Sequence, residues 1–82
     1  MSIEAIRATT AGVRDQVLAA HHDLRVARDR LADAVATLVA AGRGHSASLV
    51  TPEHQRADEQ LAACQEQLAG CLACLDRFVA GL

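Results

Sequence analysis

The sequence predicts an all-α protein, an antiparallel two-helix hairpin of coiled-coil type that assembles into a dimeric four-helix bundle. Apolar residues recur at alternating steps of three and four along two long stretches, which is the pattern of helices that pack along their whole length. Helix-forming residues dominate the 82-residue chain, which contains one proline and one aromatic residue, Phe78. The chain is therefore expected to be one domain, residues 1–82.

The first helix is expected over residues 2–41. Ser2 is a suitable N-cap, and Glu4 complements the helix dipole in the first turn. One residue in seven is large, and the position three residues later is small. The repeat runs through Ile3, Ile6, Thr10, Val13, Val17, Ala20, Leu24, Ala27, Leu31, Ala34, Leu38 and Ala41. We expect the alanines to let the two helix axes approach closely.

A loop over residues 42–51 and a second helix over residues 52–80 are expected to follow. Two glycines and two serines interrupt the repeat, and Thr51, Pro52 and Glu53 are a strong signal for a new helix start. The second repeat runs through His54, Ala57, Leu61, Cys64, Leu68, Cys71, Leu75, Phe78 and Leu82. Folding back symmetrically about the loop brings Leu24 near Leu68 and Leu31 near Leu61. It leaves Ile3, Ile6 and Thr10 beyond the end of the second helix.

The apolar face is wider than one hairpin can cover. Leu72 and Val79 lie beside the repeat of the second helix and predict a further layer of helices. We expect a homodimer, or a complex with a different helical protein partner. The residues expected to form the helix interfaces are Ile3, Ile6, Val13, Val17, Leu24, Leu31, Leu38, Leu61, Leu68, Leu72, Leu75, Phe78 and Val79.

The charge pattern excludes several classes of partner. All eight basic residues are arginine, the net charge is −2, and no basic stripe could follow a phosphate backbone, so no nucleic acid is expected. No apolar run approaches a membrane span, and no signal region opens the chain, so no membrane partner is expected. The expected location is the cytoplasm, and export of the folded hairpin without a cleaved leader stays open.

Three cysteines on the second helix carry the alternative function. Cys71 and Cys74 form a CxxC pair, and the fold-back brings His21 near them, so these three are candidate metal ligands. The other interpretation is that Cys64 and Cys71 are compact apolar side chains at the small positions of the repeat. The alternative to an interaction protein is thus a small thiol- or metal-responsive regulator that uses Cys64, Cys71 and Cys74.

No catalytic arrangement is recognisable. The histidines and serines are scattered over helices and loop without a paired base and nucleophile, and no glycine-rich loop leads from a strand into a helix. We expect no enzyme activity and no cofactor.

The chain resembles the small actinobacterial WXG100-like (ESAT-6-like) helical-hairpin proteins. The resemblance rests on the opening Ser2-Ile3-Glu4-Ala5-Ile6, the repeat of Leu24, Leu31 and Leu38, the polar turn from Gly42 to Ser48, and Phe78 near the end. The Trp-x-Gly turn of that family is missing, and so is the tyrosine of its secretion signal. The resemblance implies an adaptor, chaperone or secretion partner associated with a type VII-like system or a toxin.

Overall fold

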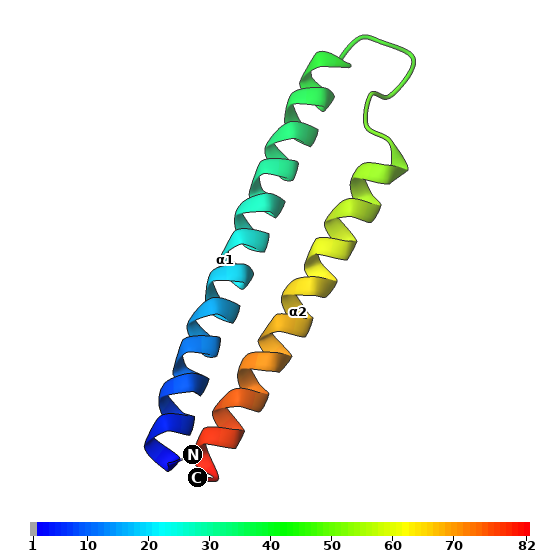
Figure 1. The fold of residues 1–82 in the computed structure, drawn as a ribbon. Coiled ribbons are helices and arrows are strands. Elements are labelled where there is room, and N and C mark those ends of the chain that lie inside the picture. The colour runs from blue at the N-terminus through cyan, green and yellow to red at the C-terminus, as the bar shows by residue number, and fades with distance from the viewer. Residues whose placement is uncertain (1) are drawn as a thin grey trace.

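The structure, a computed structural model, describes residues 2–82 as two antiparallel helices and no strand (Figure 1). Helix α1 spans Ile3–Ala41 and α2 spans Pro52–Ala80. They lie side by side in a rod whose Cα atoms extend over 65 × 14 × 14 Å. The predicted all-α helical hairpin is confirmed.

Side chains cap the start of both helices. The Ser2 hydroxyl accepts a hydrogen bond from the Ala5 backbone N–H at 3.0 Å. At the start of α2, Nδ1 of His54 accepts one from the Thr51 backbone N–H at 3.1 Å. This imidazole takes the place that glutamate or glutamine usually holds in a capping box, so His54 helps to fix the first turn of α2.

The two helices contact each other through two rows of residues on each helix. The first, called here the large row, consists of the large positions of the repeat from Thr10 onward, as the sequence predicts, whereas Ile3 is exposed. The second, called here the clamp row, lies four residues after each large position. The large rows are Thr10, Val17, Leu24, Leu31 and Leu38, and Leu61, Leu68, Leu75 and Leu82; the clamp rows are Arg14, His21, Arg28 and Val35, and Asp58, Gln65, Leu72 and Val79. Every one of these residues is at least partly buried.

The positions three residues after each large residue, called here the groove rows, turn outward instead. They are Val13, Ala20, Ala27 and Ala34 on α1, and Ala57, Cys64, Cys71 and Phe78 on α2; all but Ala27 and Ala57 are exposed. The prediction that small residues of the repeat set the approach of the two helices is therefore wrong. The clamp rows combine the apolar residues Val35, Leu72 and Val79 with polar side chains such as Arg28 and Asp58, which pair across the two helices.

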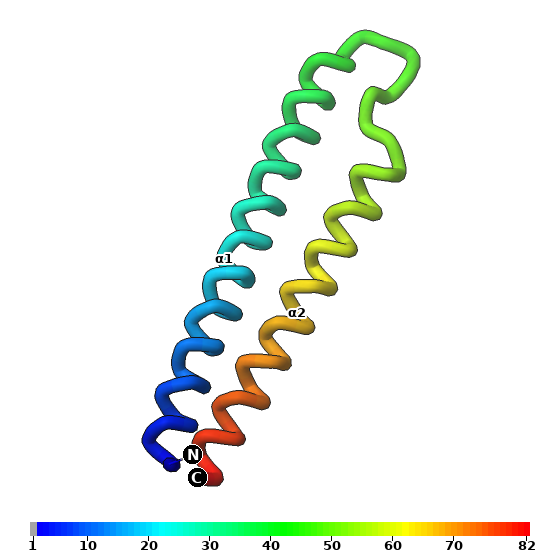
Figure 2. Tube along the Cα trace, in the orientation of Figure 1, coloured from blue at the N-terminus to red at the C-terminus, as the bar shows by residue number. Residues whose placement is uncertain are grey.

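The alignment of the helices also differs from the symmetric fold-back. The C-terminal end of α2 lies level with the start of α1, so Ile3, Ile6 and Thr10 do not extend beyond it (Figure 1). Thr10 is only 8% exposed, and its hydroxyl donates to the Ile6 carbonyl at 2.8 Å. The greater length of α1 lies at the other end, where the loop turns back before α2 begins (Figure 2). Leu49, near the end of this loop, lies beside Gly42.

Glycine is required at one position of the loop. Gly44 has a φ of +84°, in the region that side chains with a Cβ atom disfavour. We expect Gly44→Ala to lower the free energy of unfolding by about 1–2 kcal/mol. As a control, Gly12→Ala in α1, where a new Cβ meets no atom within 4 Å, is expected to raise it by about 0.5–1 kcal/mol. Urea unfolding at one protein concentration measures both effects, and a shift in the same direction for the two variants would contradict this interpretation of the loop.

Candidate interaction surface

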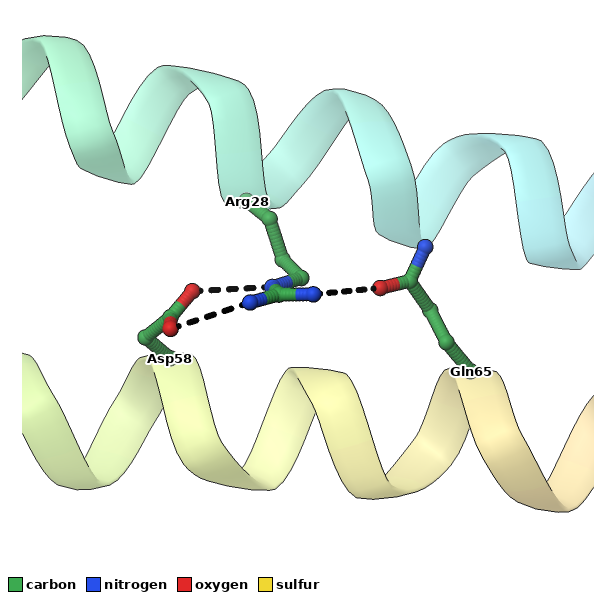
Figure 3. Close-up of polar contacts among 3 residues, drawn as sticks. All are labelled: Arg28, Asp58 and Gln65. Carbon is green, nitrogen blue, oxygen red and sulfur yellow. Dashed lines mark hydrogen bonds and ion pairs between the residues drawn. The ribbon is translucent and has the colours of Figure 1, made fainter.

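A polar cluster joins the two helices on one face of the hairpin. The guanidinium of Arg28 donates to both carboxylate oxygens of Asp58, from Nε at 2.9 Å and from Nη2 at 3.1 Å. Its Nη1 donates to Oε1 of Gln65 at 3.0 Å (Figure 3). One arginine of α1 thereby spans two residues of α2 that lie seven positions apart. Because the bidentate geometry is specific, the cluster favours one alignment of the helices along the rod.

Electrostatics within the cluster favour the charged forms of both partners. Hydrogen bonding from Arg28 lowers the pKa of Asp58 below its ordinary value of 3.8, and the carboxylate raises the pKa of Arg28. A second ion pair joins Nε of Arg14 to Oδ1 of Asp76 at 2.9 Å. All four side chains are between 38% and 57% exposed, so these pairs contribute more to alignment than to stability.

The residues of this cluster were not predicted from the sequence as a contact between the two helices. Arg28 and Gln65 lie four residues after Leu24 and Leu61, and Asp58 lies four residues after His54. Their common spacing is the signal that could have identified them. This spacing does not identify a contact by itself, because charged residues at such positions also occur on ordinary solvated helix faces.

An open apolar groove lies on the opposite face, toward the end of the rod that holds both chain termini. It is lined by Val13 and Val17 of α1, and by Cys71, Cys74, Leu75 and Phe78 of α2. In an α-helix each residue advances by about 100°, so the groove row and the clamp row flank the large row on opposite sides. Because the helices are antiparallel, the groove rows of both helices open on the same side of the hairpin. The face of the clamp rows therefore carries the polar cluster and a pocket lined by Arg28, Asp58 and Gln65 with Val35 and Val50, and the face of the groove rows carries the apolar groove.

The residues predicted for helix interfaces fall into two groups. Three of them are exposed: Ile3 at 52%, Val13 at 41% and Phe78 at 53%. The others are partly buried: Ile6, Val17, Leu24, Leu31, Leu38, Leu61, Leu68, Leu72, Leu75 and Val79. A contact of either group with a second chain stays a prediction.

The candidate metal ligands are not brought together. Cys71 and Cys74 line the groove, whereas His21 belongs to the clamp row on the other side of the large row. Within residues 2–82, no group of three or more His, Cys, Asp or Glu side chains could hold a metal ion. Cys64, Cys71 and Cys74 are free and exposed, so the seam positions predicted for Cys64 and Cys71 are wrong. A response of these thiols to oxidation stays a prediction.

Comparisons of the chain with protein-family models, with curated proteins and with solved structures found no match. The WXG100-like resemblance therefore stays a prediction. Neither helix in the described part of the chain is long and apolar enough to cross a membrane. The candidate surface is thus defined by its own geometry, an apolar groove between two helices that are held in alignment from the opposite face.

The lowered pKa of Asp58 makes stability depend on pH. Its carboxylate stabilises the folded state at pH values above the ordinary pKa of 3.8, and this contribution is lost as the pH falls through the lower pKa of the folded state. We expect the free energy of unfolding of Asp58→Asn to fall less steeply below about pH 4 than that of the unmodified protein. Asp33→Asn, which removes a carboxylate on an exposed part of α1, is the control. Denaturant unfolding across this pH range measures the slopes, and equal slopes for the unmodified protein and Asp58→Asn would contradict the role of the Arg28–Asp58 pair.

Proposed function

We propose that this protein is a non-enzymatic helical interaction protein, whose activity is to bind other helices. One observation carries the proposal: the hairpin encloses no core of its own. Although 51% of the residues are apolar, no apolar side chain within residues 2–82 is buried. Small domains are held together by such buried side chains, and this chain leaves them in contact with water.

The amount of exposed surface supports the same conclusion. A compact monomer of this mass, 8.6 kDa, exposes about 4,700 Å². This hairpin exposes 5994 Å², which is about 1,300 Å² more. Large apolar side chains contribute to the excess, among them Ile3, Val39 and Phe78, each at least half exposed. Exposed apolar surface beyond what a compact monomer leaves open is typical of a protein that binds a partner.

The kind of surface favours helices as partners. The groove lies between the two helices and is lined mostly by apolar residues, so a further helix fits it by the packing used in helix bundles. The resemblance to WXG100-like proteins supports a finer form of the proposal. In that form the hairpin is an adaptor, chaperone or secretion partner associated with a type VII-like system or a toxin.

The proposal predicts that folding depends on association. We expect the thermal midpoint to rise by about 5–10 °C over a hundredfold increase in protein concentration, because assembly stabilises the folded state by mass action. Circular dichroism under reducing conditions, paired with mass determination by sedimentation equilibrium, measures this. A folded 8.6 kDa monomer with a constant midpoint would contradict the proposal. A chain that is unfolded at every concentration would assign the helical partner to a different protein.

A further inference from the structure

We propose that Cys71 and Cys74 are a redox-active dithiol, which a small organic disulfide oxidises to a disulfide bond within one turn of α2. The bond distorts the side of the apolar groove that α2 forms. The inference assigns a modification site to the groove and names the chemical class of its oxidant. Its effect on partner binding rests on the proposed function, whereas formation of the disulfide does not.

The positions of the two thiols allow a bond between them. Both are exposed, and both line the apolar groove. Residues three apart in an α-helix lie on the same side, with Cα atoms about 5 Å apart, which a disulfide spans. Cys64 lies at least seven residues from either, or about 10 Å along the helix axis, which is too far for a disulfide. Of the three thiols of the chain, only Cys71 and Cys74 can therefore join within α2 while it stays helical.

An arginine marks Cys74 as the sulfur that attacks the oxidant. Nη2 of Arg77 donates a hydrogen bond to Sγ of Cys74 at 3.1 Å, and Arg77 also lines the groove. Attack on a disulfide spreads negative charge over the reacting sulfur atoms, and a guanidinium in contact with one of them stabilises that charge. The same cation attracts disulfides that carry carboxylates, such as those of small thiol peptides.

The reaction consists of two thiol–disulfide exchanges. First, the thiolate of Cys74 attacks one sulfur of the oxidant, whose S–S bond breaks, and a mixed disulfide forms as one small thiolate leaves. Next, the thiolate of Cys71 attacks Sγ of Cys74, forms the Cys71–Cys74 bond and releases the second small thiolate. The two small thiolates take up the two protons that the cysteines lose. Two cysteine thiols are thus oxidised by two electrons, and one small disulfide is reduced.

The helix and the disulfide hold the Cβ atoms at different distances. Residues three apart on a helix have Cβ atoms about 5–6 Å apart, whereas a disulfide holds them about 3.5–4.5 Å apart. The bond therefore pulls this turn together by roughly 1–2 Å. The turn lies close to the C-terminal end of α2, and Leu75 and Phe78, which follow it, line the groove. We expect the distortion to reach them.

Gly70 makes this part of α2 easier to deform. It directly precedes Cys71, and a Cβ atom placed there would meet no atom within 4 Å. Packing therefore does not require a glycine at this position, although glycine weakens a helix interior relative to alanine. A weak point beside the dithiol lowers the cost of drawing its two Cβ atoms together.

The first experiment tests the disulfide. Reduced protein is equilibrated with glutathione and glutathione disulfide, with the thiol in excess, and the remaining thiols are blocked with N-ethylmaleimide. Cleavage after Glu66 separates Cys64 from the other two cysteines, so mass spectrometry measures the two sites independently. We expect the Cys71–Cys74 disulfide to be at least about tenfold more abundant than glutathione on Cys64, because Cys71 reacts as an intramolecular thiol.

Matched variants test the roles of Arg77 and Gly70. Arg77→Gln keeps a hydrogen-bond donor and removes the charge, so we expect it to slow oxidation by about two- to fivefold. Arg56→Gln, near the start of α2, is expected to leave the rate unchanged. Gly70→Ala is expected to shift the equilibrium toward the dithiol by about two- to fivefold. Gly12→Ala, where a new Cβ also meets no atom within 4 Å, lies on α1 and is expected to leave it unchanged.

Hydrogen exchange tests the distortion of the groove. In the disulfide form we expect the amides of residues 72–78 to exchange at least about tenfold faster than in the dithiol form, because the bond strains the backbone hydrogen bonds of this turn. The amides of residues 56–66 are expected to keep their rates. A chain with Cys71→Ser and Cys74→Ser, treated in the same way, is expected to show no change in either segment.

Each contrary result overturns a distinct part of the inference. Glutathione on all three cysteines in equal amounts, without a disulfide, would overturn the dithiol and leave the proposed function intact. Covalent dimers on non-reducing gels in place of the internal disulfide would overturn the bond within one turn. Unchanged hydrogen exchange in the disulfide form would overturn the effect on the groove. A stably folded monomer that binds no helix would contradict the proposed function and leave the dithiol in place.

Discussion

The contact between α1 and α2 is a single strip along both helices, and its geometry determines the rest of the molecule. Two cylinders that lie side by side cover each other only along one line, so only the large rows and one flanking row on each helix can be shielded from water. The flank that carries Val35, Leu72 and Val79 is covered, and its polar members form the cluster around Arg28. The flank that carries Val13, Cys71 and Phe78 is left open as a consequence.

Much of the fold could be predicted from the sequence, because its signals are local. Helix starts at Ser2 and Thr51, the glycine-rich interruption and the row of leucines depend on neighbouring residues only. Which flank of each helix faces the other helix does not depend on neighbouring residues only. Cys71 and Leu72 are adjacent in sequence, and either could extend an apolar stripe with a period near seven. The decision depends on how much surface the partner helix covers on each side, which the pattern of one helix does not contain.

The sequence predicts which apolar residues form the candidate surface, but not on which side of the hairpin they lie. Its apolar residues were recognised, but Phe78, Cys64 and Cys71 were assigned to the contact within the hairpin. The alignment of the helices was missed for a related reason. The path of the loop past the last turn of α1 decides where α2 begins, and Leu49 beside Gly42 is part of that path. Contacts of this kind depend on tertiary packing. The symmetric fold-back instead counts residues from the middle of the loop and leaves the path of the loop out of account.

The separation of a polar face from an apolar face has a consequence for the effect of ionic strength. The ion pairs of Arg28 and Arg14 are open to solvent, so dissolved salt screens them over a Debye length of about 10 Å at 0.1 M. Salts excluded from protein surfaces strengthen the burial of apolar groups instead. In concentrated sulfate the fixed alignment of α1 against α2 would thus loosen while cohesion on the groove side grows. Concentrated sulfate therefore has opposite effects on two parts of one rod, because it screens the ion pairs and strengthens the burial of the apolar groups.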